Sequence, residues 1–385
     1  MPAFAGPLDP VALTAELVRR DTVTPDRGAG LDLLAEALGP FGFRCARVDR
    51  GGVANLYARW GETGPVLGFN GHTDVVPPGD AAAWTHPPFS GALADGAVWG
   101  RGAVDMKSGV AAFAAAAAAF VAETPPGGSI ALLITGDEEG DATDGTVALL
   151  DWMAAHGERL DACLVGEPTS AETLGDAVKI GRRGSMTTRF TATGVQGHTA
   201  YPEKARNPLP ALIRLLDRLA ATPLDQGSER FASSTLAITT VDVGNPASNV
   251  IPAAARAAVN IRFNDAHTGA ALADRLAREA DAVAAAFGVA IEAESRISGE
   301  AFVAEDPAFI ETVRGAVARV AGRPPSLATG GGTSDARFVK DHCPVIEVGL
   351  VGRRMHAVDE RAPVADIIGL AAIHRAILED FFAAR

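Results

Sequence analysis

The sequence VLGFNGHTD at residues 66–74 places a short apolar run directly before a group of polar side chains. An apolar run of this length predicts a strand that is buried on both faces, as in a parallel sheet covered by helices. A second run, Ser129–Thr135, has the same character and is followed by Gly136-Asp137-Glu138-Glu139-Gly140. Because ligands of open α/β sheets gather beyond the carboxyl ends of the strands, both polar groups are expected at one edge of a sheet.

The first 180 residues alternate between apolar runs of this kind and segments of helical character. Asp161–Val165 is predicted as a further short strand, and helices are expected over Ser108–Val121 and Thr143–Ala155. The first of these helices is rich in alanine, the residue with the highest helix propensity. Such alternation predicts an α/β domain with a mostly parallel central sheet that is covered on both faces.

A change of pattern after Gly181 predicts a smaller unit inserted into that domain. Its strands and helices are expected, in the order β-α-β-β-α-β, at Thr187–Thr193, Pro208–Ala221, Thr235–Val243, Arg256–Phe263, Gly269–Phe287 and Val289–Glu294. This order is typical of a split βαβ, ferredoxin-like sheet. The α/β pattern then resumes with a helix, a strand and a helix at Pro307–Ala321, Pro344–Val348 and Asp366–Phe382. The sequence thus predicts one discontinuous α/β domain, residues 1–180 and 297–385, interrupted by an α+β domain of residues 181–296.

The composition excludes several classes of protein. Of the 385 residues 48% are hydrophobic and 21% are charged, which is typical of a globular protein. The formal net charge of −13 argues against nucleic acid as a partner, since nucleic acid requires a basic face. The sequence begins without the pattern of a signal peptide and has no uninterrupted apolar stretch near ~20 residues. A cytoplasmic location without membrane contact is expected.

Two polar positions near predicted strand and helix ends can serve as metal ligands. His72 offers a neutral imidazole, and Asp74 is a nearby carboxylate that can fix the imidazole tautomer. Asp105 stands in the run GRGAVDMK at residues 100–107, which enters the alanine-rich helix. A helix N-cap explains an aspartate there but not the surrounding glycines and lysine. A structural histidine and a helix cap are the alternatives for these positions.

Further carboxylates and a second histidine follow other predicted strands. The three consecutive carboxylates Asp137–Glu139 repel one another unless a cation is present, although a solvated acidic loop is the alternative. Glu167 and His356 are unremarkable singly. Taken together, two imidazoles and three carboxylates are expected at one sheet edge: His72, Asp105, Glu139, Glu167 and His356.

This ligand set predicts two closely similar metal sites that share one carboxylate. Nitrogen and oxygen ligands without thiolate suit zinc, cobalt or manganese, and zinc is the usual occupant. Two such ions ~3.5–4 Å apart polarise a carbonyl and activate water. Glu138 adjoins a ligand without being needed as one, which makes it the natural general base.

The motifs that carry these residues resemble the signatures of the M20 metallopeptidase and aminoacylase family. The resemblance lies in GHTDVVPPGD (71–80), RGAVDMK (101–107) and DEEG (137–140). Within that family, VGEPT (165–169), GRRGS (181–185) and GGTSDARF (331–338) are similar to runs of the succinyl-diaminopimelate desuccinylases. The resemblance covers essentially the whole chain.

The resemblance implies a role for each matching residue. His72 and Glu167 would bind one zinc ion, Glu139 and His356 the other, and Asp105 would bridge them. Asp74 would orient His72, and Glu138 would act as acid and base. His198, in GHTAYP at 197–202, matches a histidine that stabilises the transition state, and the resemblance implies a homodimer in which it reaches the partner subunit's metals. The expected substrate contacts are Arg182, Arg183, Ser185, Asn249, Arg262, Gly332 and Thr333.

An anionic substrate is indicated independently by two adjacent arginines. Arg182 and Arg183 lie together in a glycine-bounded turn, and guanidinium groups suit bidentate capture of a carboxylate. An exposed, solvated turn is the alternative. The loop at residues 330–333 lacks the Gly-Lys-Ser/Thr ending of a phosphate-binding P-loop. Gly352 departs from the desuccinylase pattern, in which many members have Asn four residues before the last zinc-binding histidine.

The expected reaction is the hydrolysis of N-succinyl-LL-2,6-diaminopimelate to succinate and LL-2,6-diaminopimelate, which serves lysine and cell-wall precursor synthesis. A related deacylase or dipeptidase, such as acetylornithine deacetylase, is the alternative within the class. A non-catalytic binding relative is the alternative from another class. Such a relative should have lost a ligand or the base, yet every one is present.

Overall fold

The computed structural model describes residues 6–384, and the chain divides into two compact units. The first unit runs to Ile180 and is completed by Ala304–Ala328 and by the segment that begins at Ser334. The second unit consists of Gly181–Val303 and Thr329–Thr333.

The first unit is built on an eight-stranded sheet in the order β1-β2-β6-β3-β7-β18-β8-β17. At its centre β3 (Val66–His72) pairs in parallel with β6 (Ser129–Thr135) and β7 (Ala162–Val165), and β7 pairs in parallel with β18 (Val345–Glu347). Every residue of β3 and β6 is buried. The predicted mostly parallel central sheet is therefore confirmed, and its carboxyl edge lies just beyond His72, Thr135 and Val165.

Smaller elements complete the first unit. They are β1 (Arg44–Arg47), β2 (Leu56–Trp60), β8 (Ala177–Lys179), β17 (Ser326–Ala328), the three-stranded sheet of β4 (Ala92–Ala94), β5 (Ala97–Trp99) and β19 (Arg361–Pro363), and the short helix α8 (Ala336–Val339). The antiparallel edge formed by β1 and β2 was not predicted, because β1 is polar and mostly exposed and so lacks the apolar run of the central strands.

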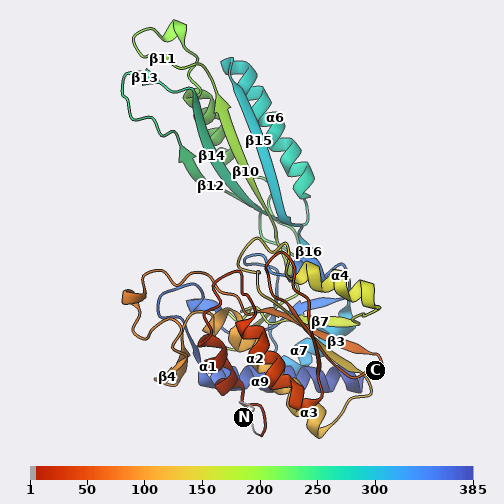
Figure 1. Ribbon diagram of the computed structural model, residues 1–385. Helices are drawn as coiled ribbons and strands as arrows, with labels where there is room; N and C mark the ends of the chain where they lie inside the picture. The colour runs from red at the N-terminus through yellow and green to blue at the C-terminus, as the bar shows by residue number, and fades with distance from the viewer. Residues whose placement is uncertain (1–5, 385) are drawn as a thin grey trace. The chain divides into compact units, whose positions relative to one another are not determined.

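The longer helices of this unit cover the central sheet (Figure 1). They are α1 (Pro10–Val18), α2 (Ala29–Leu38), α3 (Ser108–Glu123), α4 (Thr146–His156), α7 (Pro307–Ala321) and α9 (Val364–Ala383). Helix α4 begins three residues later than predicted, because the preceding residues are held in a loop in which the Asp144 amide donates to Asp137.

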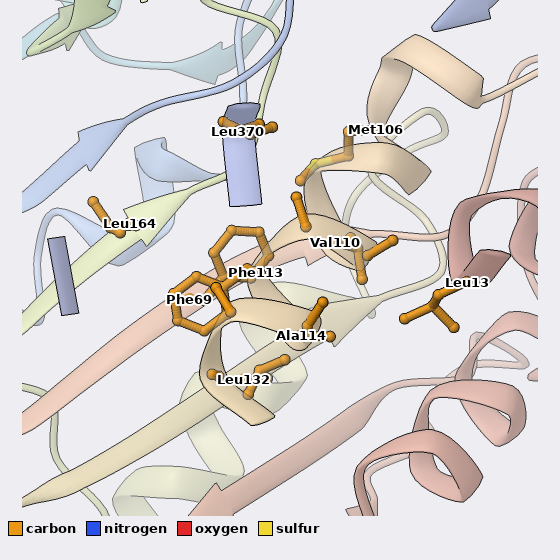
Figure 2. Packing of buried hydrophobic residues seen from close by; sticks show 14 of the residues in the cluster. Leu13, Phe69, Met106, Val110, Phe113, Ala114, Leu132, Leu164 and Leu370 are labelled. Carbon is orange, nitrogen blue, oxygen red and sulfur yellow. The ribbon is translucent and has the colours of Figure 1, made fainter. Parts of the chain in front are cut away.

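The alanine-rich helix α3 lies in the centre of the core. Its Phe113 ring stacks on Phe69 of β3 with a centroid distance of 4.3 Å, and apolar side chains surround the pair (Figure 2). At Gly109 an added Cβ would lie 2.5 Å from the backbone oxygen of Gly166, so glycine allows the start of α3 to contact the loop after β7. The stretch Ala103–Glu123 is long and apolar enough to cross a membrane, but 94% of its most apolar window is buried within the protein. Burial of this kind is typical of a core helix.

The second unit contains a four-stranded antiparallel sheet in the order β12-β14-β10-β15. Its strands and helices are β10 (Gly184–Thr193), α5 (Leu209–Ala221), β12 (Thr235–Asp242), β14 (Ala254–Phe263), α6 (Gly269–Phe287) and β15 (Ala290–Gly299). The predicted β-α-β-β-α-β succession is thus observed, and Figure 1 shows α6 lying along the sheet. Leucines of both helices pack on the apolar side chains of β10 and β14. Strand β12 forms one edge and is almost entirely exposed.

The second unit extends beyond the predicted limits of residues 181–296. Strand β15 is longer than expected, and β16 (Phe302–Val303) returns to pair with β9 (Gly181–Arg182) at the start of the unit. The segment Thr329–Thr333 also belongs to this unit, where the Arg182 side chain donates to the Gly332 carbonyl at 2.9 Å. Neither contact can be read from local sequence, because both join segments that are far apart in the chain.

Candidate metal centre

One group of three potential ligands lies at the carboxyl edge of the central sheet. His72 ends β3, Glu167 follows β7, and Asp105 lies in the distorted helical turn η3 (Ala103–Lys107). The His72 Nε2 atom lies 3.3 Å from Asp105 Oδ1 and 3.5 Å from Glu167 Oε1. All three residues are buried.

A second group shares Asp105 with the first. His356 Nε2 lies 2.9 Å from Glu139 Oε1 and 3.4 Å from Asp105 Oδ2. In each group the ligand atoms lie within 4.8 Å of one another. Asp105 therefore presents one carboxylate oxygen to each group, which is the geometry that a bridging ligand requires.

Asp74 holds the imidazole of His72 and the loop that carries the acidic residues. His72 Nδ1 lies 2.9 Å from the Asp74 backbone oxygen, and because a carbonyl can only accept, Nδ1 carries the proton. In the neutral ring Nε2 is then left as a lone pair directed at Asp105 and Glu167. The Asp74 carboxylate accepts from the backbone amides of Glu138 and Glu139 at 3.2 and 3.0 Å. One side chain thus positions parts of both ligand groups.

The electrostatics of the two groups call for added positive charge. Burial opposes protonation of His72, but its contacts with Asp105, Asp74 and Glu167 outweigh burial and raise its pKa well above the usual value. Contacts with Asp105 and then Glu139 raise the pKa of His356 to about 10. The carboxylates therefore retain protons on the imidazoles at neutral pH when nothing else neutralises them. A divalent cation would displace those protons.

The residues fit a pair of divalent metal ions. His72 Nε2 and Asp105 Oδ1 are buried and have no hydrogen-bond partner among the residues that the structure describes. Buried polar atoms are rarely left unpaired, so these two call for a ligand. Two imidazoles and three carboxylates suit zinc, cobalt or manganese.

Glu138 lies next to the ligand loop but belongs to neither group. Its withdrawal from water, reinforced by the nearby charge of Glu167, raises its pKa well above the usual value. A carboxyl group with a raised pKa can both accept and return a proton near neutral pH. This is the property that a general base and acid requires.

The second unit brings together several of the predicted substrate residues. Ser185 on β10 is paired with Arg262 on β14. Burial lowers the pKa of Arg262, and repulsion by the nearby charge of Arg183 lowers it further. Arg183 Nε and Arg262 Nη1 are buried atoms without a hydrogen-bond partner among the described residues. Two guanidinium groups with unused donors form a candidate anion site, here called the arginine pair.

His198 and Asn249 lie elsewhere in the second unit. His198 is on β11 (Gly197–His198), which pairs with β13 (Val250–Ile251), and the Thr199 amide donates to the Asn249 carbonyl. The Ala200 amide donates to His198 Nδ1 at 3.0 Å, so the proton of the neutral ring is on Nε2, in a side chain that is exposed. Figure 1 shows β11 and β13 beyond the end of the four-stranded sheet opposite to β16.

Two buried charged residues near the ligands were not predicted as site residues. Glu360 accepts a hydrogen bond from the Asp105 amide at 3.2 Å, and Arg101 forms an ion pair with Glu360 at 2.6 Å. Arg101 belongs to the motif RGAVDMK (101–107), but no local pattern marks Glu360.

Comparisons with known proteins identify the relatives of this chain. The sequence profile of peptidase family M20/M25/M40 matches residues 68–380. A succinyl-diaminopimelate desuccinylase of Cereibacter sphaeroides is 63% identical over 379 residues, which are 98% of this chain and all of the relative. A succinyl-diaminopimelate desuccinylase of Ruegeria pomeroyi is 60% identical over 378 residues, again 98% of this chain and all of the relative.

Solved structures show the same fold at low sequence identity. The M20 family metallo-carboxypeptidase Sso-CP2 of Sulfolobus solfataricus has a TM-score of 0.80 at 14% identity, with 97% of this chain and 99% of that chain covered. The Bacillus subtilis YXEP protein, a dinuclear metal-binding peptidase of the M20 family, has a TM-score of 0.73 at 16% identity, with 97% of both chains covered. The resemblance inferred from the motifs is therefore confirmed, and the chain belongs to peptidase family M20/M25/M40.

Proposed function

We propose that this chain is a metal-dependent amide hydrolase that converts N-succinyl-LL-2,6-diaminopimelate and water to succinate and LL-2,6-diaminopimelate. The observation that carries the proposal is the placement of Asp105, with one carboxylate oxygen toward His72 and the other toward His356. Full-length relatives at 60% identity and above, named for this reaction, support the choice of substrate.

The five clustered residues would hold two metal ions. His72 and Glu167 would bind one, Glu139 and His356 the other, and Asp105 both. Zinc is the ion that this donor set suits best, with cobalt or manganese as substitutes. When bound, the two ions polarise the amide carbonyl and increase the acidity of the attacking water.

Glu138 would carry the proton through the reaction. Its carboxylate takes a proton from water as the oxygen attacks the succinyl carbonyl carbon. It then gives that proton to the amide nitrogen as the carbon–nitrogen bond breaks, so that succinate and a free amine leave. The raised pKa of Glu138 suits both steps. Asp74 positions Glu138 and the neighbouring ligand by accepting from their backbone amides.

The arginine pair would receive a carboxylate of the substrate. The unused donors of Arg183 and Arg262 suit an anion, and burial makes a charged hydrogen bond there stronger than in water. Ser185, Gly332 and Thr333 would add neutral contacts around that anion. A succinyl group ends in a carboxylate that an acetyl group lacks, so this contact favours the succinylated substrate.

His198 would donate to the oxygen that becomes negative when the amide is attacked. Its ring is exposed, and because Nδ1 accepts from the Ala200 amide, Nε2 carries the proton that this role requires. Ser185 and Thr193 lie about 26 Å apart along β10 at the rise of an extended strand. The arginine pair and His198 lie near opposite ends of this strand (Figure 1). Because one substrate is too small to contact both, we further propose a homodimer in which the partner subunit supplies His198.

The exposed edge strand β12 gives such a dimer a means of assembly. Unpaired strand edges associate readily, and a twofold axis joins two copies of the same edge. Two inactive variants, Glu138→Gln and His198→Ala, test this arrangement when they are mixed under conditions of subunit exchange. One active site of each mixed dimer would then hold both intact residues, so activity should partly return. No recovery after proven exchange would place His198 within its own subunit's site or outside catalysis.

The substrate is tested by comparing kcat/KM for N-succinyl-LL-2,6-diaminopimelate and for N-acetylornithine on the zinc-loaded protein. A missing charged contact should cost the acetylated substrate roughly 10²-fold or more. Equal or better turnover of acetylornithine would favour the deacetylase alternative. As a biosynthetic enzyme of this kind, the protein is proposed to act in the cytoplasm.

A further inference from the structure

We infer that Arg101 and Glu360 form a buried ion pair that positions Asp105 and His356, and that this pair controls metal binding by the second ligand group more than by the first. The inference rests on the proposed two-metal centre. The first group is His72, Asp105 and Glu167, and the second is Asp105, Glu139 and His356.

Glu360 holds the backbone that carries the shared ligand. Its Oε1 atom accepts hydrogen bonds from the amides of Val104 at 2.8 Å and Asp105 at 3.2 Å. The Gly100 amide donates to the Glu360 carbonyl at 2.9 Å, so the segment of residues 100–105 is attached to Glu360 at three points. The side chain of Glu360 is 0% exposed, and these bonds are therefore shielded from competition by water.

Arg101 connects that turn to the loop of the second histidine. Its Nη1 atom lies 2.6 Å from Glu360 Oε2 and donates to the Ala357 carbonyl at 3.3 Å. Its Nη2 atom donates to the His356 carbonyl at 3.2 Å. The guanidinium also lies over the Trp84 ring, 5.2 Å from its centroid, and Arg101 is 3% exposed.

The backbone of His356 needs such support. Its φ of 63° is in the left-handed region, which residues other than glycine adopt rarely and only when surrounding contacts hold them there. Arg101 supplies a contact to the carbonyl of that residue and to the next one. His72 is held in a different way, at the end of β3 and through its Nδ1 contact with the Asp74 backbone. Loss of the ion pair should therefore disturb His356 and Asp105 together while His72 keeps its position.

A buried pair is a sensitive positioning device, because removing one partner leaves the other charge buried and unpaired. Glu360→Gln retains an acceptor for the two amides but removes the charge that orients Arg101. Arg101→Lys retains the charge but cannot donate in a fork to both carbonyls and the carboxylate. The two variants thus break the same connection from opposite sides.

The test is a titration of the metal-free full chain with zinc by calorimetry, supported by the visible spectrum of the cobalt form. Replacing a residue that orients ligands typically weakens metal binding by ~10–100-fold. Both variants should show such a loss at the step that His356→Ala also weakens, which is binding by the second group, and a smaller change at the other step. Excess metal should restore turnover, which would not occur if either residue took part in the chemical step.

A matched control is available in the same unit. Arg59 and Glu158 form another largely shielded ion pair, and Glu158→Gln and Arg59→Lys make the same changes there. These controls should leave both binding steps unchanged. Thermal unfolding of each metal-free variant reports its folded fraction, and Arg101→Lys remains informative if Glu360→Gln unfolds.

Two unchanged dissociation constants in both variants, or equal weakening of the two steps, would overturn the inference. A parent chain that binds fewer than two ions at saturation would instead overturn the proposed two-metal centre. The measurement thus separates failure of the inference from failure of the function on which it rests.

Discussion

Replacement of Arg262 by Met should impair recognition of the succinylated substrate without weakening the fold. Arg262 Nη1 is buried and has no hydrogen-bond partner within residues 6–384, and burial and then the charge of Arg183 lower the pKa of Arg262. Both observations mean that the charged guanidinium of Arg262 destabilises the ligand-free protein. The substitution removes the hydrogen bond from Arg262 Nε to Asn260, which destabilises the fold. It also removes the repulsion between Arg262 and Arg183, which stabilises the fold. The free energy of unfolding should therefore change by less than about 1 kcal/mol.

The effect on catalysis follows from the bond that the substrate carboxylate would make. A hydrogen bond to a charged group contributes about 1.5–3 kcal/mol, which corresponds to roughly 10- to 150-fold in kcat/KM. The assay compares kcat/KM for N-succinyl-LL-2,6-diaminopimelate and for the N-acetyl analogue. The loss should appear with the succinylated substrate and be much smaller with the acetylated one.

Arg256 provides the matched control, because it lies on the same strand β14 with an exposed side chain. Arg256→Met should leave both substrates unaffected. Equal losses on the two substrates in Arg262→Met, or no loss on either, would refute recognition of the succinyl carboxylate by this residue.

Other predictions concern the base, the ligands and a buried histidine. Glu138→Gln removes the base and keeps the size of the side chain, so turnover should fall by ~10²–10⁴-fold. Elemental analysis should find the metal content unchanged. Loss of metal with retained turnover would mean that the roles of Glu138 and Glu139 are exchanged. Asp105→Ala should reduce the metal content of both sites, whereas His356→Ala should reduce chiefly one; equal effects in calorimetric titrations would contradict the bridging role. Burial lowers the pKa of His374 to about 4. Between that pKa and its ordinary value, the side chain is neutral in the folded protein but protonated in the unfolded chain. The unfolded chain therefore binds one more proton than the folded protein below the ordinary pKa of about 6.5. As the pH falls from 7.5 to 5, His374 should decrease the free energy of unfolding by about 2 kcal/mol. Denaturant titrations should find a smaller pH dependence in His374→Leu, and an unchanged dependence would refute this assignment.

The clustering of the candidate metal ligands can be predicted from the sequence because three of their positions follow from strand ends. His72 ends β3, Glu139 and Glu167 follow shortly after β6 and β7, and parallel strands bring their carboxyl ends to one edge. Each strand is an apolar run whose length is visible locally. Asp105 and His356 do not follow a strand directly, so they are predicted as ligands only because they complete a set of two imidazoles and three carboxylates.

What the sequence does not predict depends on contacts between distant segments. Glu360 has no motif around it, and its importance is apparent only when the turn at residues 103–107 and the His356 loop are brought together. The late boundary of the second unit depends likewise on the pairing of β16 with β9. The resemblance implies a substrate contact for both Asn249 and the arginines, and the structure places Asn249 beside His198, away from the arginine pair. A motif gives the identity of a site residue but not the end of a sheet on which that residue lies.

The number of metal ions bound per chain, measured together with the release of succinate, tests the central claim most directly. The metal-free protein would be titrated with zinc, and bound metal would be determined alongside the rate of hydrolysis of N-succinyl-LL-2,6-diaminopimelate. Two ligand groups that share Asp105 predict saturation at two ions per chain, with succinate released by the loaded protein. Saturation at one ion with full hydrolysis, or two bound ions without any release of succinate, would contradict the proposed two-metal desuccinylase.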